Sequence, residues 1–401
     1  MTSSPLSGGS SGTGQPPAFI QRTGLFAMAA VCGLAVANIY YNQPMIGIIE
    51  AEFEQPEITR LIPTATQLGY ALGLFFLLPV GDIVERRRLI VGQFLLLAVA
   101  LVGAALATSA WVLVAASLAV GASASVAQQI VPLSATLSDP ARRGRAIGTV
   151  MAGLLSGILL SRTLSGFVGE HLGWRDMFWV GVPLALVSAG LMRRVLPVLS
   201  PHTPMAYGRA LRSLANLWMR HRELRAAALV QACLFGSFSA FWTILALYLA
   251  GPNFGLGADV AGLFGVLGVV GVAAAPIAGK LSDKYNPRVT VWAGVALCIF
   301  AWGAAGSFAA IAALIIAVIV MDFGFQIALI SNQHIVYSLA QAARGRLNTI
   351  LMTGMFLGGA AGSALSTYAW AVGGWGGVSI LGVGLAVAAL AVMAVHRPKA
   401  A

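Results

Sequence analysis

The chain has 401 residues, of which 58% are hydrophobic and only 9% charged, and its mean hydropathy is +0.85. Because an ordinary soluble domain carries about 25% charged residues, this composition excludes a soluble globular protein. Lipid cannot hydrogen-bond the backbone, so long apolar segments of roughly 20 residues predict membrane-spanning helices. The fold class expected is an all-α, multi-pass membrane protein.

Twelve apolar segments follow a polar, Ser- and Gly-rich tail at 1–20. Basic, proline-interrupted residues at 196–223 predict a cytoplasmic linker between two domains, 21–195 and 224–396, with a short tail at 397–401. The expected spans are 24–49, 58–80, 88–108, 111–137, 145–169, 176–195, 224–250, 258–280, 288–307, 309–338, 346–370 and 375–395.

Basic residues gather in alternate connections, which predicts that both termini are cytoplasmic. The expected location is the cell inner (plasma) membrane. Of the 24 Lys and Arg, all but Arg60, Arg162 and Arg175 then lie on the cytoplasmic side. The loop after the first span is acidic instead, beginning with Glu50 and Glu52. The net charge of +11 therefore indicates membrane topology, with anionic-lipid contact, and not nucleic-acid binding.

Three sets of residues recur at a single offset of 201 positions, which indicates two homologous six-helix halves. The pairs are Asp82 with Asp283, Arg143-Gly144-Arg145 with Arg344-Gly345-Arg346, and Gly173-Trp174 with Gly374-Trp375.

The loop between the second and third spans contains Gly81, Asp82 and Arg86, and a fuller copy of this pattern begins at Gly279 and includes Asp283. With the six-plus-six arrangement and the parallel repeat, these loops resemble the major facilitator superfamily over nearly the whole chain past residue 20. The resemblance implies alternating access, a cavity lined by spans 1, 4, 7 and 10, and an inner gate at these five residues. Plain positive-inside loops are the alternative, although they explain the arginines and not the repeated Asp.

Further segments with a recognisable pattern are 38–44, Gln128 with Pro132, 162–166 and Asn332-Gln333. They resemble a bacterial branch of the drug-proton antiporter type, near sugar and nucleoside exporters. The chain departs from that branch twice. Residues 121–125 of span 4 lack the Arg that many proton-coupled relatives carry, and Gly157 of span 5 is followed by Ile158 instead of a Gly-Pro pair. These departures leave a uniporter or an importer of a polar metabolite open.

Only Arg162 and Asp322 place an ionisable side chain at membrane depth, where charge is costly and indicates function. We expect Asp322 to accept a proton or an ammonium group, with Gln326 and Gln333 near the same helix face. A structural ion pair or a helix–helix hydrogen bond is the alternative. For Arg162, binding of a substrate anion and pairing across the domain interface are equally open, and a direct pair with Asp322 is a further option.

The first span carries Asn38, Tyr41 and Asn42 at helical spacing, broadened by Tyr40 and Gln43. Through the family resemblance this stripe predicts a substrate face, and interfacial anchoring of the tyrosines is the alternative. Residues on the other cavity spans would complete the pathway: Gln128, Gln129, Gln231, Trp242, Asn332 and Gln333.

Together these features predict a secondary active transporter that exports a small organic solute, such as a drug-like cation, a sugar or a nucleoside, in exchange for protons. The sequence contains no P-loop, catalytic motif or metal-ligand spacing, so we expect no enzyme activity, cofactor or metal. The expected partners are a small-molecule substrate, the proton and the lipid bilayer, and the expected state is a monomer. A membrane sensor or scaffold is the alternative outside transport.

Overall fold

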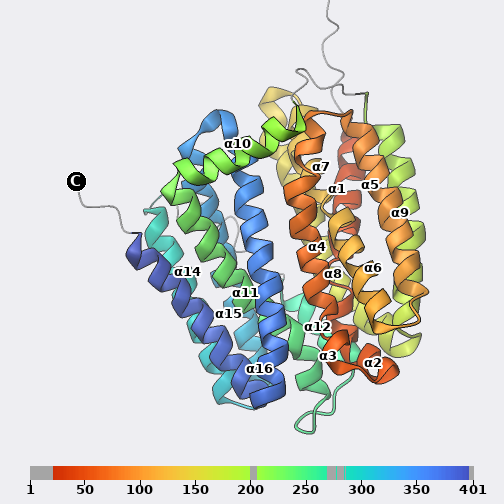
Figure 1. Ribbon diagram of the computed structural model, residues 1–401, viewed down its shortest axis with the longest axis vertical. Helices are drawn as coiled ribbons and strands as arrows, with labels where there is room; N and C mark the ends of the chain where they lie inside the picture. Colours follow the sequence, from red (N-terminus) through yellow and green to blue (C-terminus); the bar gives the residue numbers. More distant parts are fainter. Residues whose placement is uncertain (1–20, 199–205, 269–276, 278–283, 285, 397–401) are drawn as a thin grey trace, which may run out of the picture.

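A computed structural model describes residues 21–198, 206–268, 277, 284 and 286–396. Within those residues all regular secondary structure is helical. The helices stand roughly upright in two groups, and α10 (Tyr207–Arg220) crosses one end of the molecule (Figure 1). We call that end the α10 end and the opposite one, which carries α2 (Asn42–Phe53), the α2 end.

The N-terminal half contains six spans, of which the first and the fourth are each broken into two helices. A turn at 38–41 separates α1 from α2 in the first span. Pro44 lies in the first turn of α2, where a missing N–H is tolerated. The elements are α1 (Arg22–Ala37), α2, α3 (Pro56–Thr59), α4 (Ile62–Phe76), η1 (Pro79–Asp82), α5 (Arg86–Ala105), α6 (Ala110–Ala124), α7 (Ala127–Thr136), η2 (Pro140–Arg142), α8 (Arg143–His171) and α9 (Trp174–Val195).

The C-terminal half ends in α16 (Arg344–Val395), whose 52 residues would measure about 78 Å as one straight helix. That length far exceeds the roughly 30 Å of a bilayer core, and non-helical backbone at Gly374 divides α16 into two spans. The other elements are α11 (Arg222–Ala250), α12 (Ala258–Leu267), α14 (Pro287–Ser307), α15 (Ile311–Leu339) and η3 (Gln341–Ala343).

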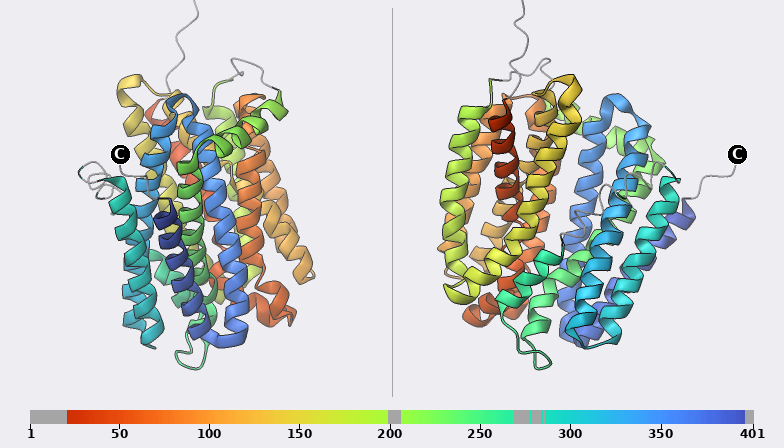
Figure 2. Two further views of the ribbon diagram at one scale, coloured as in Figure 1. Left: turned by 60° about the vertical axis from the view of Figure 1, so that its left-hand side comes forward. Right: turned by 180° about the vertical axis from the view of Figure 1, so that it is seen from behind.

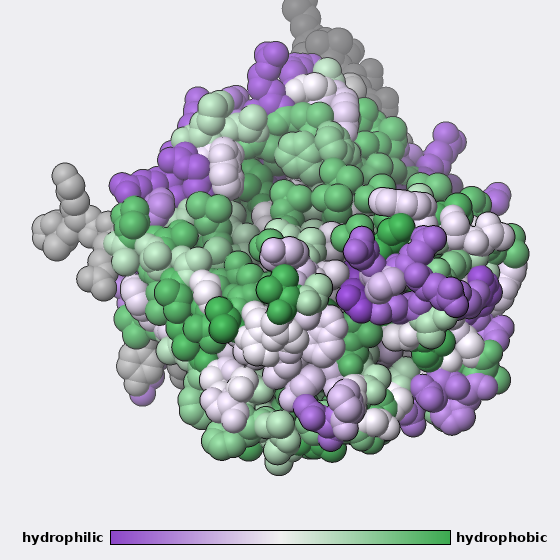
Figure 3. Space-filling view, turned by 60° about the horizontal axis from the view of Figure 1, so that its bottom comes forward, coloured by the Kyte–Doolittle hydropathy of each residue, from purple (hydrophilic) through white to green (hydrophobic). Residues whose placement is uncertain are grey.

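In the described part of the chain ten helices are long and apolar enough to cross a membrane, α16 among them, and α12 is a shorter apolar helix. The predicted all-α membrane fold is therefore confirmed. Its outer surface carries large apolar side chains such as Val99, Phe300 and Ile380, exposed by 67%, 61% and 76%. Such a surface is expected to contact lipid. Figure 3 looks obliquely onto the α2 end, where hydrophilic residues gather in separate patches among hydrophobic ones.

The repeat seen in the sequence is also present in the backbone. Gly173 and Gly374 both have positive φ, 111° and 54°, and each lies directly before the last span of its half. In the same way, α8 and α16 each begin with the arginine that follows a short 3-10 turn, Arg143 or Arg344. The residues that share the offset thus occupy equivalent places in the two halves.

Glycines allow two helix pairs to pack closely, one in each half. A Cβ at Gly157 of α8 would lie 2.5 Å from the Cα of Gly33 in α1. At the repeat offset, a Cβ at Gly358 of α16 would lie 2.5 Å from the carbonyl carbon of Ala232 in α11. These glycines are therefore packing positions, as predicted for small residues between membrane helices.

The halves meet along two further helix pairs, α8 with α12 and α4 with α16. At the first pair a Cβ on Gly166 would lie 3.0 Å from the Cα of Gly262, so the backbones are nearly in contact. The right-hand view of Figure 2, from behind, shows the two halves side by side. At the α10 end, the Tyr207 hydroxyl of α10 donates a hydrogen bond to the Phe76 carbonyl oxygen at 2.9 Å.

Candidate substrate and coupling site

Arg162 lies between the halves, in α8, with only 3% of its surface exposed. Its guanidinium carbon is 4.5 Å from the Tyr40 ring centroid and 3.9 Å from that of Trp242, distances typical of cation–π contacts. Its Nε donates a hydrogen bond to the Gln43 side-chain oxygen at 2.9 Å. Because Trp242 belongs to α11, the arginine of one half is covered by a ring of the other.

Two N–H groups of this site have no acceptor among the described residues. They are Nη2 of Arg162 and Nε1 of Trp242, both buried. Leaving such donors unpaired is costly, which marks them as candidates for ligand binding. A cavity of about 10 Å³, room for about one water molecule, lies beside Trp242 and Gln43. Its other lining residues are Pro44, Leu245, Ala246 and Ala261.

Asp322 of α15 is 8% exposed, and in the described part of the chain it and Arg162 are the only buried charged side chains. No ion pair joins the two, since their N and O atoms are more than 4.0 Å apart. Both lie against the end of α12: a Cβ at Gly265 would be 2.9 Å from the Arg162 Cβ, and one at Gly268 would be 3.1 Å from Oδ2 of Asp322. Arg162 and Asp322 are therefore near neighbours that remain unpaired in this conformation.

The polar stripe predicted on the first span divides into two sets. Tyr40 and Gln43 contact Arg162, as described above. Asn38 instead donates to the Leu34 carbonyl oxygen at 2.7 Å, and Asn42 donates to the Thr66 hydroxyl of α4 at 2.8 Å. Tyr41 is also buried, with 2% of its surface exposed. The two asparagines thus bond within the N-terminal half rather than to Arg162.

Two of the predicted glutamines form hydrogen bonds inside their own half. Gln129 donates to the side chain of Gln93 in α5, whereas its neighbour Gln128 is half-buried. Gln231 of α11 accepts a hydrogen bond from Asn332 of α15 at 3.2 Å. These pairs hold neighbouring helices together, which is the role that buried amides commonly have in membrane bundles.

Gln326 and Gln333 follow Asp322 along α15, and both are half-buried. Neither side chain forms a hydrogen bond with another described residue. Their place in the pathway remains a prediction.

A cluster of hydroxyl groups, not predicted from the sequence, lies at the second pair of helices between the halves, α4 and α16. Ser363 of α16 accepts hydrogen bonds from Thr64 of α4 at 3.0 Å and from Thr243 of α11 at 2.9 Å. Ser363 occupies the position 201 residues after Arg162, so the two halves use different chemistry at equivalent positions. The repeat offset was the signal that could have pointed to Ser363.

A row of aromatic side chains, also not predicted from the sequence, begins at Trp242 and ends on the other half. Neighbouring ring centroids along the row are between 4.3 and 6.1 Å apart. Its last member, Tyr70, belongs to α4, so the row crosses between the halves. In order the rings are Trp242, Phe238, Phe325, Phe235, Phe356 and Tyr70.

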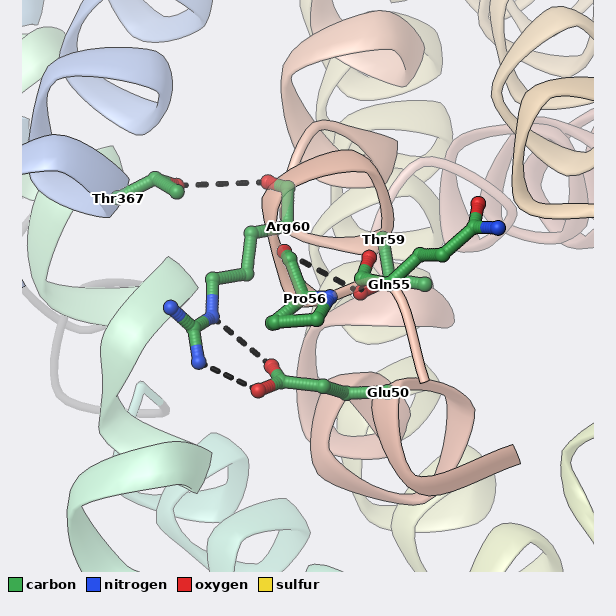
Figure 4. A network of polar contacts seen from close by, with 6 residues as sticks. All are labelled: Glu50, Gln55, Pro56, Thr59, Arg60 and Thr367. Atoms are coloured by element: carbon green, nitrogen blue, oxygen red, sulfur yellow. Dashed lines mark hydrogen bonds and ion pairs between the residues drawn. The ribbon is translucent and has the colours of Figure 1, made fainter. Parts of the chain in front are cut away.

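Both arginines at the α2 end are neutralised by glutamates of α2. Arg60 forms an ion pair with Glu50, and its carbonyl oxygen accepts a hydrogen bond from Thr367 of the other half at 3.4 Å (Figure 4). Arg175 pairs with Glu52 at 2.5 Å. Arg60 and Arg175, which were expected outside the cytoplasmic side, thus have their positive charges balanced by neighbouring glutamates.

A further contact between the halves at the α2 end involves Glu170. Its carboxylate, at the end of α8, accepts the backbone N–H of Ala258, the first residue of α12, at 2.9 Å. A carboxylate at a helix N-terminus satisfies a free N–H and interacts favourably with the helix dipole. Glu170 therefore joins one half to the first turn of a helix in the other.

The predicted inner gate can be located in one of its two copies. Asp82 pairs with Arg86 at 3.3 Å, the two side chains being 52% and 38% exposed. Arg86 also donates to the Gly81 carbonyl oxygen at 3.2 Å. Gly279 and Asp283 lie outside the described residues. The gating role remains a prediction for both copies.

A model of the Major Facilitator Superfamily matches residues 25–342 and 227–401 of this sequence. The chain belongs to the major facilitator superfamily. It is 40% identical to a putative uncharacterized transporter, YgaY, of Escherichia coli K12 over 93% of this chain and 96% of that protein. A probable sugar efflux transporter of Helicobacter pylori is 25% identical, over 67% of this chain and 70% of that protein.

The fold also matches that of a solved transporter from this superfamily. The crystal structure of a mutant of the nucleoside transporter NupG superposes with a TM-score of 0.74 at 12% identity, covering 94% of this chain and 99% of that one. The protein is thus a multi-pass membrane transporter of the major facilitator type.

Proposed function

We propose that the protein exports a small organic solute in exchange for protons, with its halves rocking about a site at Arg162 and Asp322. The observation that carries this proposal is Asp322, a carboxyl group buried between the halves and not paired with Arg162. Because no described residue forms an ion pair with it, this carboxyl group can hold either a proton or a cationic group of the solute. Because only one of them fits at a time, arrival of the proton favours release of the solute.

Alternating access requires contacts that form at one end when the other end opens. Three contacts at or towards the α2 end join the halves: Arg162 with Trp242, Glu170 with the start of α12, and Thr367 with Arg60. All three would break if the site opened towards that end. They support a conformation in which the α2 end is closed.

For orientation we propose that the α10 end and both termini are cytoplasmic in a bacterial inner membrane, because arginines gather at that end. The solute then enters from the α10 end and leaves at the α2 end. The efflux named for the Helicobacter pylori relative agrees with this direction. We further propose that the monomer is the working unit.

A uniporter or importer of a polar metabolite is the second candidate, favoured by the packing of span 4. Gly121 lies so close to the Thr66 carbonyl oxygen of α4 that a side chain there would clash, and Ser123 and Ser125 bond carbonyl groups of their own helix at 2.8 and 2.7 Å. Span 4 therefore contributes no charge to coupling. Outside transport, a sensor or scaffold would bind a partner without moving solute.

The test is internal pH in proteoliposomes of the purified protein, challenged with pools of metabolites and antimicrobials. A solute-dependent proton flux is expected for the wild type and is lost in Asp322→Asn, whereas the exposed Asp176→Asn is the matched control that keeps it. Uptake of labelled solute without proton flux would replace this proposal with the uniporter. Solute binding without any uptake would favour the sensor.

A further inference from the structure

The two buried charges of the site have opposite signs and are held apart. Arg162 and Asp322 both lie against α12, next to Gly265 and Gly268, which are three residues or about 5 Å apart along a helix. No ion pair closes the gap between them. Among the described residues neither side chain has an ion-pair partner of opposite sign, and buried charge is costly unless it is paired. The site as a whole is neutral, but it is charged at two separate points.

On the arginine side the site has more donors than acceptors among the described residues. Nε of Arg162 is already bonded to Gln43, whereas Nη2 has no acceptor among the described residues. Nε1 of Trp242, whose ring lies 3.9 Å from the guanidinium carbon, is also unpaired. A carboxylate is an acceptor-only group that fits the fixed N–H geometry of a guanidinium. Of the common solute groups, an anion satisfies both free donors.

On the aspartate side the site offers an acceptor next to apolar rings. Phe325 lies one helical turn after Asp322 and belongs to the aromatic row that starts at Trp242. An ammonium group would compensate the carboxylate, and an apolar group attached to it would lie along the rings.

We propose that the transported solute is a small zwitterion with an apolar side group, whose anionic group binds Arg162 and Trp242 and whose ammonium group binds Asp322. A solute with one charge leaves one of the two protein charges uncompensated, whereas a zwitterion compensates both. This inference rests on the proposed function and keeps its direction of coupling, because the ammonium group and the proton compete for Asp322. The cavity of about 10 Å³ beside Trp242 is by itself too small for such a solute.

The experiment compares matched sets of three solutes that share one apolar group. The first set is phenylalanine, 3-phenylpropionate and 2-phenylethylamine, which carry both charges, only the anion and only the cation. The second is tryptophan with indole-3-propionate and tryptamine, and the third is leucine with 4-methylpentanoate and 3-methylbutylamine. Binding to the purified full-length protein is measured by calorimetry, and proton flux is measured in proteoliposomes.

We expect the zwitterion of at least one set to bind about tenfold or more tightly than both partners of that set, because each partner leaves a buried charge unpaired. In Arg162→Gln the zwitterion should lose its advantage over the amine, and in Asp322→Asn its advantage over the acid. The exposed Arg194→Gln and Asp176→Asn are the matched controls and should keep both advantages. If Arg162→Gln fails to fold, Arg162→Lys replaces it. In Arg162→Lys the zwitterion should keep part of its binding advantage over the amine.

Equal binding within all three sets, or preference for a singly charged member, overturns the zwitterion inference. If no zwitterion is preferred while other solutes still drive Asp322-dependent proton flux, the inference fails and the proposed function stands. If a zwitterion binds as expected but moves no protons, the inference stands and proton exchange fails.

Discussion

The guanidinium carbon of Arg162, in the N-terminal half, lies 3.9 Å from the ring centroid of Trp242, in the C-terminal half. This buried contact joins the halves at the site itself, so the ring covers the arginine only while the halves are together. Opening towards the α2 end must separate the two side chains.

Removing the Trp242 ring should therefore favour opening at the α2 end. A desolvated cation–π contact contributes about 2 kcal/mol, so Trp242→Ala should shift the equilibrium about thirtyfold, whereas Trp242→Phe should shift it less. The measurement is the labelling rate of Ala246→Cys, at the adjacent cavity, in a chain whose Cys32, Cys233 and Cys298 are replaced. An unchanged rate in Trp242→Ala would show that this contact does not hold the site closed.

Glu170 should act as a weaker lock at the same end. Glu170→Ala removes both the acceptor of the Ala258 N–H and the charge next to the helix N-terminus, an effect of about 1 kcal/mol or a several-fold faster labelling rate. Glu170→Gln keeps an acceptor and should give a smaller change. Glu54 is an exposed glutamate at the same end, so Glu54→Gln is the control. If Glu54→Gln changes the labelling rate as much as Glu170→Gln does, Glu170 is not a lock.

Stability should depend sharply on glycines at close helix crossings. Gly157→Val places a side chain against the Gly33 backbone, where it cannot fit, so we expect a loss of about 3 kcal/mol or more and poor yield of folded protein. Gly148, in the same helix, has open space around it, and Gly148→Val should be tolerated. Thermal unfolding monitored by size-exclusion chromatography compares the two, and equal melting temperatures would contradict the packing argument.

Asp82→Asn should slow transport with little effect on stability. The pair with Arg86 is solvent-accessible, so it contributes about 1 kcal/mol at most to the stability of this conformation. The gating role expected from the family instead requires the Asp82 charge in the other conformation of the transport cycle. Initial uptake rates and accessibility to a cysteine label at the α10 end are compared with those of Asp139→Asn. Wild-type rates and wild-type labelling together would leave Asp82 without a gating role.

The sequence could predict the two charged residues of the site but not their surroundings. Arg162 and Asp322 stand out because charge is rare in apolar spans. Phe238 and Phe325 gave no signal, because phenylalanine in such a span is equally suited to lipid, to the core or to a pathway. The span boundaries were predictable because the length of an apolar segment is a strong signal. The positions of the rings were not, because the sequence does not show in which direction an apolar side chain points.

The first span shows where periodicity stopped being informative. Helical spacing placed Asn38, Tyr41 and Asn42 on one face. The turn at 38–41 interrupts the helix, so Tyr40 and Gln43 are the ones that contact Arg162. A broken helix shifts the angular relationship between residues on its two sides, and a fixed period cannot anticipate that shift.

The α10 helix restricts how far the two halves can separate at the α10 end. As a helix of 14 residues it is about 21 Å long and cannot stretch. Tyr207 ties it to α4, and Leu214 packs with Leu224 and Leu347 of the C-terminal half. The α10 end can therefore widen only as far as this helix tilts or detaches. If solute enters at that end, as we propose, a helix outside the binding site sets an upper limit to its size.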